Sequence, residues 1–138
     1  MKRLLLTISI VCLILVNYTA VNGAEWAYYG KDKLGNRFYY DEESVASGGN
    51  GIIKVWNKKV YSNKGKRDFI KSEKNNIGFK NISHTLAFMS YSCSTSEVGT
   101  TSFTTYSTAG NAIDSGSFPL QRIPVPPDSV LETLYNIV

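Results

Sequence analysis

Apolar side chains fall on both faces at the start of the segment IIKVWNKKVY, between Ile52 and Tyr61, in which nearly every residue suits a β-strand. Successive side chains of a β-strand point to opposite faces, so Ile52 and Trp56 share one face while Ile53 and Val55 share the other. Lysines enter both faces in the second half of the segment. Lysine can lay its aliphatic stem along apolar surface and keep its ammonium group in water. The pattern predicts a central strand with one solvent-exposed end.

Two aromatic segments, Glu25–Tyr29 and Arg37–Asp41, come before this strand. Both have strand-like composition, and glycine and asparagine lie between them, so they predict a β-hairpin with a longer loop. The loop superficially resembles a phosphate-binding loop, but Asn36 and Arg37 replace the lysine and the Ser or Thr that such a loop requires. We interpret it as a turn. Ser47–Gly51 is then expected to be a flexible connector.

The segment from Asn63 to Lys80 is polar and basic. Phe69 and Ile70 could support a short helix there, but the asparagine and glycine residues at positions 75, 76 and 78 favour an early end. We therefore expect this segment to be the least ordered part of the chain.

Three further strands are predicted after the basic segment. Ser83–Ser94 alternates large side chains on two faces, which favours a strand next to the central one. Thr100–Tyr106 is rich in threonine and aromatic residues, and Asn111–Ser115 follows it across a glycine-containing turn. This arrangement is typical of a β-hairpin.

The end of the chain predicts a short helix. Four prolines between positions 119 and 127 impose an extended backbone that does not join the centre of a sheet. Ser129 and Glu132 then form a capping box. Val130, Leu134 and Ile137 share one stripe, which we expect to pack on the sheet. The predicted fold is α+β, mainly β: an antiparallel sheet of about six strands with a short C-terminal helix packed on it.

The first residues have the layout of a secretory signal peptide: Lys2 and Arg3, an apolar run from Leu4 to Val16, and small or polar residues up to Gly23. We expect cleavage after residue 23, which leaves residues 24–138 as one domain without a transmembrane segment. An uncleaved anchor is the alternative, but the run is shorter than the roughly 20 apolar residues that a spanning helix needs. The protein is therefore expected in the periplasm, at the cell surface or outside the cell.

The charge of the chain is concentrated in one segment. The formal net charge is +4, and nine lysine or arginine residues lie between Lys54 and Lys80, against only Asp68 and Glu73. This distribution indicates a local basic patch or simply a solvated surface. Nucleic acid is not an expected partner, because the sequence contains no recognisable recognition module and export separates the protein from it.

No catalytic, metal or cofactor motif is found in the sequence. His84 is the only histidine, so a site with several imidazole ligands is excluded, and no G-x-S-x-G turn is present. A thiol nucleophile formed by His84 and Cys93 is also excluded on a continuous strand, because nine residues span roughly 30 Å. The tyrosines at positions 28, 29, 39 and 40 could form a binding face, although strand alternation predicts that about half of them pack in the core.

Cys93 is the only cysteine left after signal cleavage, because Cys12 lies in the signal segment. Exported proteins are exposed to oxidising conditions, so an unpaired cysteine needs an explanation. It could be a buried small apolar residue, one half of a bridge between two chains, or a cysteine whose partner is missing from this chain.

The order of these segments resembles the surface-adhesin protein E family of secreted bacterial domains. The resemblance covers nearly the whole mature chain and rests on Trp26, the segments FYYDEESV, VWNKKVY and IPVPPDSVLETLY, the strand that ends at Cys93, and the hairpin from Tyr106 to Ser115. It implies an antiparallel sheet with a C-terminal helix, often fastened by a disulfide from the sheet to the end of the helix. Cys93 matches the sheet cysteine of that bridge. The chain stops at Val138, about where the partner would come, so either the tether is absent or the sequence ends early.

The resemblance implies an adhesin-like function. Our first hypothesis is an exported, non-enzymatic domain that binds a protein or a component of an envelope or host surface. The alternatives are an envelope-associated assembly factor that acts as a homo-oligomer, with Cys93 as the bridge, and a hydrolase that uses His84. The candidate binding surface combines the exposed end of the central strand with the basic segment: Tyr39, Lys58, Lys59, Tyr61, Lys64, Lys66 and Arg67.

Overall fold

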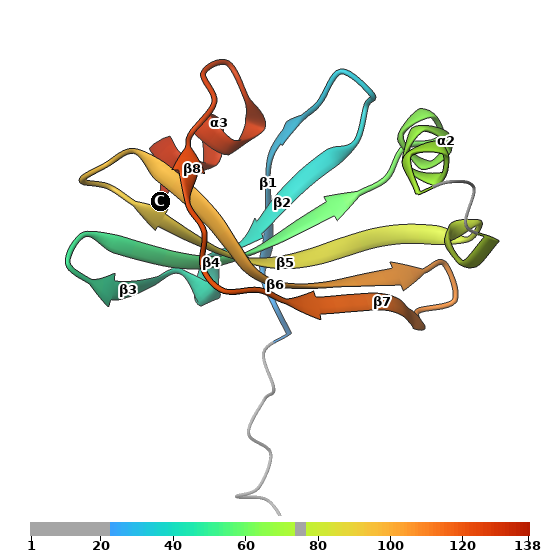
Figure 1. Ribbon diagram of the computed structural model, residues 1–138, viewed down its shortest axis with the longest axis horizontal. Helices are drawn as coiled ribbons and strands as arrows, with labels where there is room; N and C mark the ends of the chain where they lie inside the picture. Colours follow the sequence, from blue (N-terminus) through green and yellow to red (C-terminus); the bar gives the residue numbers. More distant parts are fainter. Residues whose placement is uncertain (1–22, 74–76) are drawn as a thin grey trace, which may run out of the picture.

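One antiparallel sheet organises the computed structural model, which describes residues 23–73 and 77–138 (Figure 1). Its main strands occur in the order β1 (Trp26–Lys31), β2 (Arg37–Asp41), β4 (Ile52–Val60), β5 (Ile82–Ser92), β6 (Glu97–Ser107) and β7 (Ala112–Ser117). Two short strands lie off this path: β3 (Ala46–Gly49) pairs with β4, and β8 (Ile123–Pro124) pairs with β6. The helices are α2 (Asn63–Ser72) and α3 (Val130–Ile137), and the 3-10 turns are η1 (Glu42–Ser44) and η2 (Ile77–Phe79). The predicted signal segment lies outside the described residues except for Gly23.

The central strand and the mainly β fold are confirmed. β4 pairs with β5 along its whole length, and its other edge is shared by β3 on the first half and β2 on the second half. The sheet has eight strands, more than the six or so expected, partly because Ser47–Gly51 is not a flexible connector. Asn50 and the flanking Gly49 and Gly51 all have positive φ, which allows a tight turn that folds β3 back onto β4.

Both predicted hairpins are confirmed as antiparallel pairs, β1 with β2 and β6 with β7. The first hairpin contains a bulge: Tyr28 lies opposite Tyr39 and Gly30 lies opposite Phe38, which leaves Tyr29 as the extra residue. The ring of Tyr29 contacts the rings of Phe38 and Tyr40, so the bulge turns this tyrosine towards the same face as those two residues.

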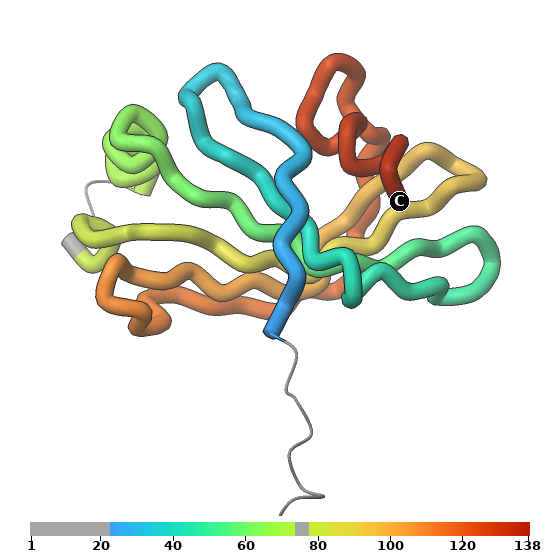
Figure 2. The backbone as a smooth tube through the Cα atoms, turned by 180° about the vertical axis from the view of Figure 1, so that it is seen from behind, coloured from blue at the N-terminus to red at the C-terminus, as the bar shows by residue number. Residues whose placement is uncertain are grey.

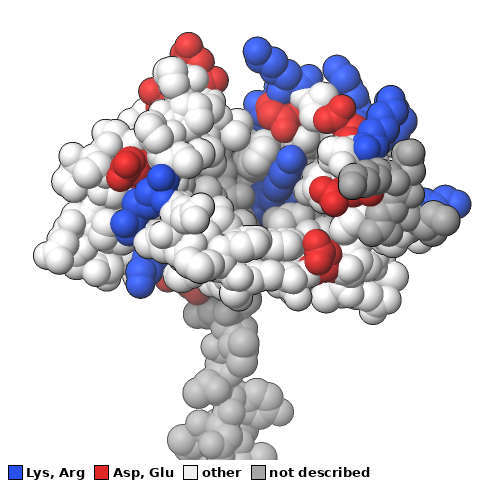
Figure 3. Space-filling view, viewed as in Figure 1, with Lys and Arg blue, Asp and Glu red and all other residues white. Residues whose placement is uncertain are grey.

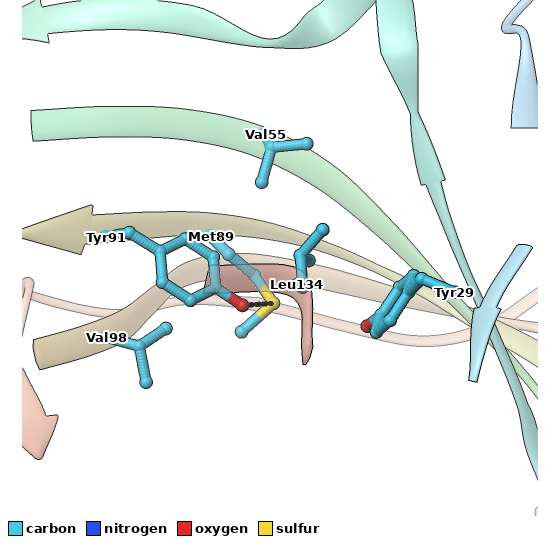
Figure 4. Packing of buried hydrophobic residues seen from close by; sticks show 6 residues of the cluster. All are labelled: Tyr29, Val55, Met89, Tyr91, Val98 and Leu134. Carbon is cyan, nitrogen blue, oxygen red and sulfur yellow. Dashed lines mark hydrogen bonds between the residues drawn. The ribbon is translucent and has the colours of Figure 1, made fainter. Parts of the chain in front are cut away.

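Both helices lie on the same side of the sheet, as the views from the front and the back show (Figures 1 and 2). The main core forms between this face and α3. It contains six buried residues, drawn in Figure 4: Tyr29, Val55, Met89, Tyr91, Val98 and Leu134. A second, smaller cluster beneath α2 consists of Tyr61, Phe79 and Ile82, with Phe69 and Ile70 packed against it.

Helix α3 begins as predicted at Ser129, whose hydroxyl accepts a hydrogen bond from the Glu132 N–H at 3.2 Å. The Glu132 carboxylate reaches back to the N–H of Asp128 instead of that of Ser129. The predicted core stripe is wrong for Ile137, which is 49% exposed. The buried face of α3 is turned away from the predicted stripe, because Tyr135 also packs on the sheet, where its ring contacts Tyr91.

Helix α2 replaces the expected poorly ordered segment over residues 63–72. Its start is fixed by Ser62, whose hydroxyl accepts from the Gly65 N–H at 2.9 Å and donates to the Leu34 carbonyl at 2.6 Å. Its apolar residues Phe69 and Ile70 pack on the smaller core cluster. Tertiary contacts therefore stabilise a helix whose sequence is otherwise polar. The asparagines expected to end it, at positions 75 and 76, lie outside the described residues.

Candidate binding surface

The side of the sheet opposite the helices carries the even-numbered residues of β4, and we call it the open face. Neighbouring strands bring aromatic and aliphatic side chains beside them: Trp56 lies opposite Phe88, and Lys58 lies opposite both Leu86 and Tyr39. Trp26, His84 and Tyr106 extend the same face on β1, β5 and β6. The open face thus consists of Trp26, Tyr39, Lys54, Trp56, Lys58, His84, Leu86, Phe88 and Tyr106.

A cavity of about 360 Å³ opens on this face between the two tryptophans. We call it the aromatic cavity; it is lined by Ala24, Trp26, Asp41, Trp56, Leu86 and Tyr106. The Trp56 ring packs against the Phe88 ring in a tilted arrangement, with 5.0 Å between the ring centres. These aromatic walls and the single carboxylate of Asp41 suit an apolar anchor with a polar neighbour.

Two cationic or titratable groups lie beside the aromatic cavity. The Lys58 ammonium is 5.1 Å from the centre of the Trp26 ring, within the range of a cation–π interaction. The His84 ring stacks on Tyr106 at 5.0 Å, and burial lowers the pKa of His84, with the nearby Lys58 charge acting in the same direction. Both effects favour the neutral form of His84, so Lys58 supplies the positive charge of this part of the open face.

The structure does not bring all sequence-predicted residues into one surface. Tyr39 and Lys58 lie on the open face, whereas Lys59 and Tyr61 point to the opposite face, which carries the helices. Tyr61 is only 8% exposed. The Lys59 ammonium lies between two rings, 4.9 Å from the centre of Tyr61 and 5.8 Å from that of Phe38. Burial lowers the pKa of Lys59, while the Asp32 and Asp68 carboxylates oppose that effect.

The remaining predicted residues, Lys64, Lys66 and Arg67, lie on α2, where they join lysines and an arginine of the β1–β2 hairpin. The side chain of Asn36 accepts a hydrogen bond from the Ser62 N–H at 2.9 Å, so the loop of the hairpin is fixed beside the start of α2. Figure 3 shows Lys and Arg side chains gathered over these two elements, with acidic side chains among them. Lys31, Lys33 and Arg37 lie in and beside the loop of the hairpin that the sequence predicts, and this basic loop was the signal that could have added them to the predicted surface.

Cys93 is exposed and directly follows β5. It is a free cysteine, and its carbonyl accepts a hydrogen bond from the Tyr135 hydroxyl at 3.2 Å. The backbone at Cys93 is thus fastened to α3 without a covalent bond.

The described residues offer little for catalysis or metal binding. His84 Nδ1 lies 3.2 Å from the Ser83 hydroxyl, and its ring stacks on Tyr106, so no carboxylate orients it among the residues described. Within residues 23–73 and 77–138, no three His, Cys, Asp or Glu side chains are grouped so that they could hold a metal ion. No helix in the described part of the chain is long and apolar enough to span a membrane.

Comparison with known proteins identifies one family. The model of the family described as surface-adhesin protein E matches residues 26–138. No curated protein sequence matches the chain. Among solved structures, the chain is similar to the selenomethionine form of protein E from Haemophilus influenzae, with 15% sequence identity and a TM-score of 0.52. The matched region covers 80% of this chain and 83% of that one, and at this identity the similarity concerns the fold.

Proposed function

The chain belongs to the surface-adhesin protein E family, and from this premise we propose that it is an exported, non-enzymatic domain that binds a protein on a surface through the open face. Membership of the family supports an adhesin-like role but does not identify a ligand, because proteins that share a fold can have different functions. The binding surface must therefore be argued from the side chains.

The observation that carries the proposal is a cavity with two tryptophans on the face that neither helix covers. Trp26, Trp56 and Tyr106 surround the cavity, although apolar residues of a small domain normally pack in its core. Tryptophan, tyrosine and arginine dominate the energetics of protein interfaces. The arrangement is therefore the one expected of a site that receives an apolar anchor from a partner.

The charge of this face favours an acidic partner. Lys58 lies beside the aromatic cavity, and Lys54 lies on the same strand and face, so cations flank the aromatic rings. A partner with carboxylates around an apolar anchor would complement this pattern. Electrostatic complementarity mainly increases the rate of association and the specificity, while the buried aromatic contacts provide most of the affinity.

Binding to cultured epithelial cells and to a panel of purified extracellular host proteins tests the proposal. We expect Trp26→Ala and Lys58→Glu to weaken binding at least about tenfold. Lys66→Glu makes the same charge change on α2 and is expected to bind as the wild type does. The proposal fails if the wild-type protein binds none of these probes, or if only Lys66→Glu weakens binding, which would place the site on α2.

A homo-oligomer is a second candidate function, favoured by the exposure of the free Cys93. An exposed thiol in an oxidising compartment can form a disulfide between two copies. Electrophoresis without reducing agent should then show a dimer that disappears in Cys93→Ser. A monomer under both conditions would exclude the bridged assembly.

A further inference from the structure

A second cavity on the open face brings together two cationic side chains, Lys54 and Arg122. It has a volume of about 290 Å³, and its lining includes Ile52, Lys54, Phe88, Ser90, Leu120 and Arg122. We call it the cationic cavity. Its walls thus combine positive charge and a hydroxyl group with aromatic and aliphatic surface. Phe88 lines this cavity and contacts Trp56 of the aromatic cavity, so the two cavities are neighbours.

Arg122 is placed in the cavity by a close crossing of two backbone segments. β8 pairs with β6 so that Ile123 lies opposite Val98, which brings the preceding residues over Gly99. A Cβ atom at Gly99 would lie 2.4 Å from the carbonyl oxygen of Gln121, closer than atoms can approach. The absence of a side chain at Gly99 therefore permits the crossing that places the guanidinium group beside β5.

The positive charge of Arg122 has no counter-charge in the described part of the chain. Its Nη2 donates to the hydroxyl of Ser90 at 3.2 Å, and Ser90 is only 2% exposed. Its Nε is buried and has no acceptor among the described residues. Neither Arg122 nor Lys54 forms an ion pair there, and the Glu97 carboxylate on the neighbouring strand accepts from Thr95.

A partly buried guanidinium that lacks a counter-charge is stabilised when an anion accepts from its free donors. A cavity lined by one sign of charge also concentrates counter-ions, because its low-dielectric walls focus the field. The guanidinium fork matches the oxygens of a carboxylate or phosphate, and the lysine adds a second cation. The neighbouring Phe88, Ile52 and Leu120 can contact an apolar group attached to that anion.

We propose that the cationic cavity is a binding site for an oxyanion carried on an apolar group. Its biological role rests on the proposed function: an acidic group of the partner would enter this cavity while an apolar anchor occupies the aromatic cavity. The site itself can be examined without any partner, so a failure of one proposal is distinguishable from a failure of the other.

Titration of the purified protein with small probes, followed by NMR of the backbone amides, tests the site. Phenylacetate and benzylphosphonate carry a carboxylate and a phosphonate on the same ring, and phenylacetamide is their uncharged counterpart. We expect one or both anions to shift the amides of Phe88, Ser90 and Arg122, and phenylacetamide to bind at least about tenfold more weakly. The stronger anion identifies which oxyanion the site prefers.

Substitutions distinguish the contribution of the paired guanidinium donors from that of positive charge alone. Arg122→Gln should weaken anion binding at least about tenfold, whereas Arg122→Lys should retain part of it. Arg67→Gln removes the same charge from α2 and should leave binding unchanged. If Arg122→Gln does not fold, Lys54→Gln provides the second variant and should also weaken binding. Equal binding of phenylacetamide, absence of shifts with both anions, or unchanged binding in the folded cavity variants would overturn the proposal.

Discussion

Gly65 of helix α2 lies against the side-chain amide of Asn36 in the β1–β2 loop. A Cβ atom at Gly65 would be 1.8 Å from Asn36 Oδ1, which is far inside a van der Waals contact. Asn36 is fully buried; its Oδ1 accepts from the Ser62 N–H at 2.9 Å, and its Nδ2 donates to Asp32 at 2.8 Å. One asparagine thus joins the hairpin loop to the start of the helix, and only glycine fits opposite it.

Gly65→Ala should lower the free energy of unfolding by about 1–3 kcal/mol, because the new methyl group displaces the Asn36 amide. The direction of this change in stability is diagnostic, since alanine in place of glycine within a helix usually stabilises a protein by about 0.5–1 kcal/mol. Urea denaturation of the two proteins measures the difference.

Two controls accompany this substitution. Arg67→Ala on the exposed side of the same helix should change stability by less than about 0.5 kcal/mol. In Asn36→Ala/Gly65→Ala the destabilisation should be less than the sum of the two single effects, because the clashing oxygen is gone. A variant Gly65→Ala that is as stable as the wild type would show that the contact does not constrain this position.

Tyr29→Phe should destabilise the protein by about 1–3 kcal/mol at neutral pH. The Asn57 amide donates to the Tyr29 hydroxyl, and both side chains are buried, so the substitution leaves a polar group without a partner. Tyr91→Phe is the matched control: among the described residues the Tyr91 hydroxyl donates only to the Met89 sulfur, at 4.0 Å, and we expect a change below about 1 kcal/mol. If thermal or urea denaturation shows the same loss of stability in Tyr29→Phe and in Tyr91→Phe, the proposed role of Asn57 is contradicted.

Stability should fall as the pH rises above about 10, the ordinary pKa of tyrosine in the unfolded chain. Burial raises the pKa of Tyr29, Tyr61 and Tyr91, so these residues keep their protons in the folded state while the unfolded state loses them. Tyr29 and Tyr91 each lower the free energy of unfolding by about 1.4 kcal/mol per pH unit above that value, and Tyr61 adds to the fall. Below it their contribution is constant. Burial lowers the pKa of Lys59, so this residue raises stability with pH only up to the ordinary lysine pKa of about 10.5, and it offsets the fall only at the start of this range.

Urea denaturation between about pH 9 and about pH 11 tests this dependence. In Tyr91→Phe the slope should be shallower by about 1.4 kcal/mol per pH unit, because one buried phenol is removed. A slope that is identical in the two proteins would show that Tyr91 ionises as readily in the folded state as in the unfolded one.

A cysteine appended after Val138 should raise the melting temperature in oxidising buffer. The family resemblance implies a bridge from the position of Cys93 to the end of the helix, and the Tyr135 hydroxyl already contacts the Cys93 carbonyl. Such a bridge contributes roughly 2–4 kcal/mol. The gain should disappear in reducing buffer and in Cys93→Ser, and an unchanged melting temperature in oxidising buffer would refute the tether.

The parts of the fold that depend on local pattern were predictable from the sequence. The strand-forming residues around Val55 and Trp56, with apolar side chains on both faces, identified β4 as the central strand, and the aromatic segments on either side of Gly35 identified the first hairpin. Ser129 and Glu132 marked the start of α3. In each case neighbouring residues alone determine the backbone, so the strands and the helix start follow from short-range chemistry.

The features that escaped prediction depend on contacts between distant segments. Helix α2 forms because Ser62 and Gly65 meet the hairpin loop at Asn36, which no local pattern contains. The cationic cavity needs Lys54 and Arg122 side by side, although they lie in different segments, and the crossing at Gly99 brings them together. The predicted binding surface grouped Lys58 with Lys59 by their order in the chain, whereas strand alternation sends them to opposite faces.

The placement of both helices on one side of the sheet has a consequence for how this domain can evolve. Along β4, Val55 and Asn57 support the fold, while Lys54, Trp56 and Lys58 face outward on the other side. Tolerance to mutation should therefore alternate with a period of two along the strand. Surface specificity can then diversify through every second residue while the remaining residues preserve foldability, so that relatives could share this architecture and still recognise different partners.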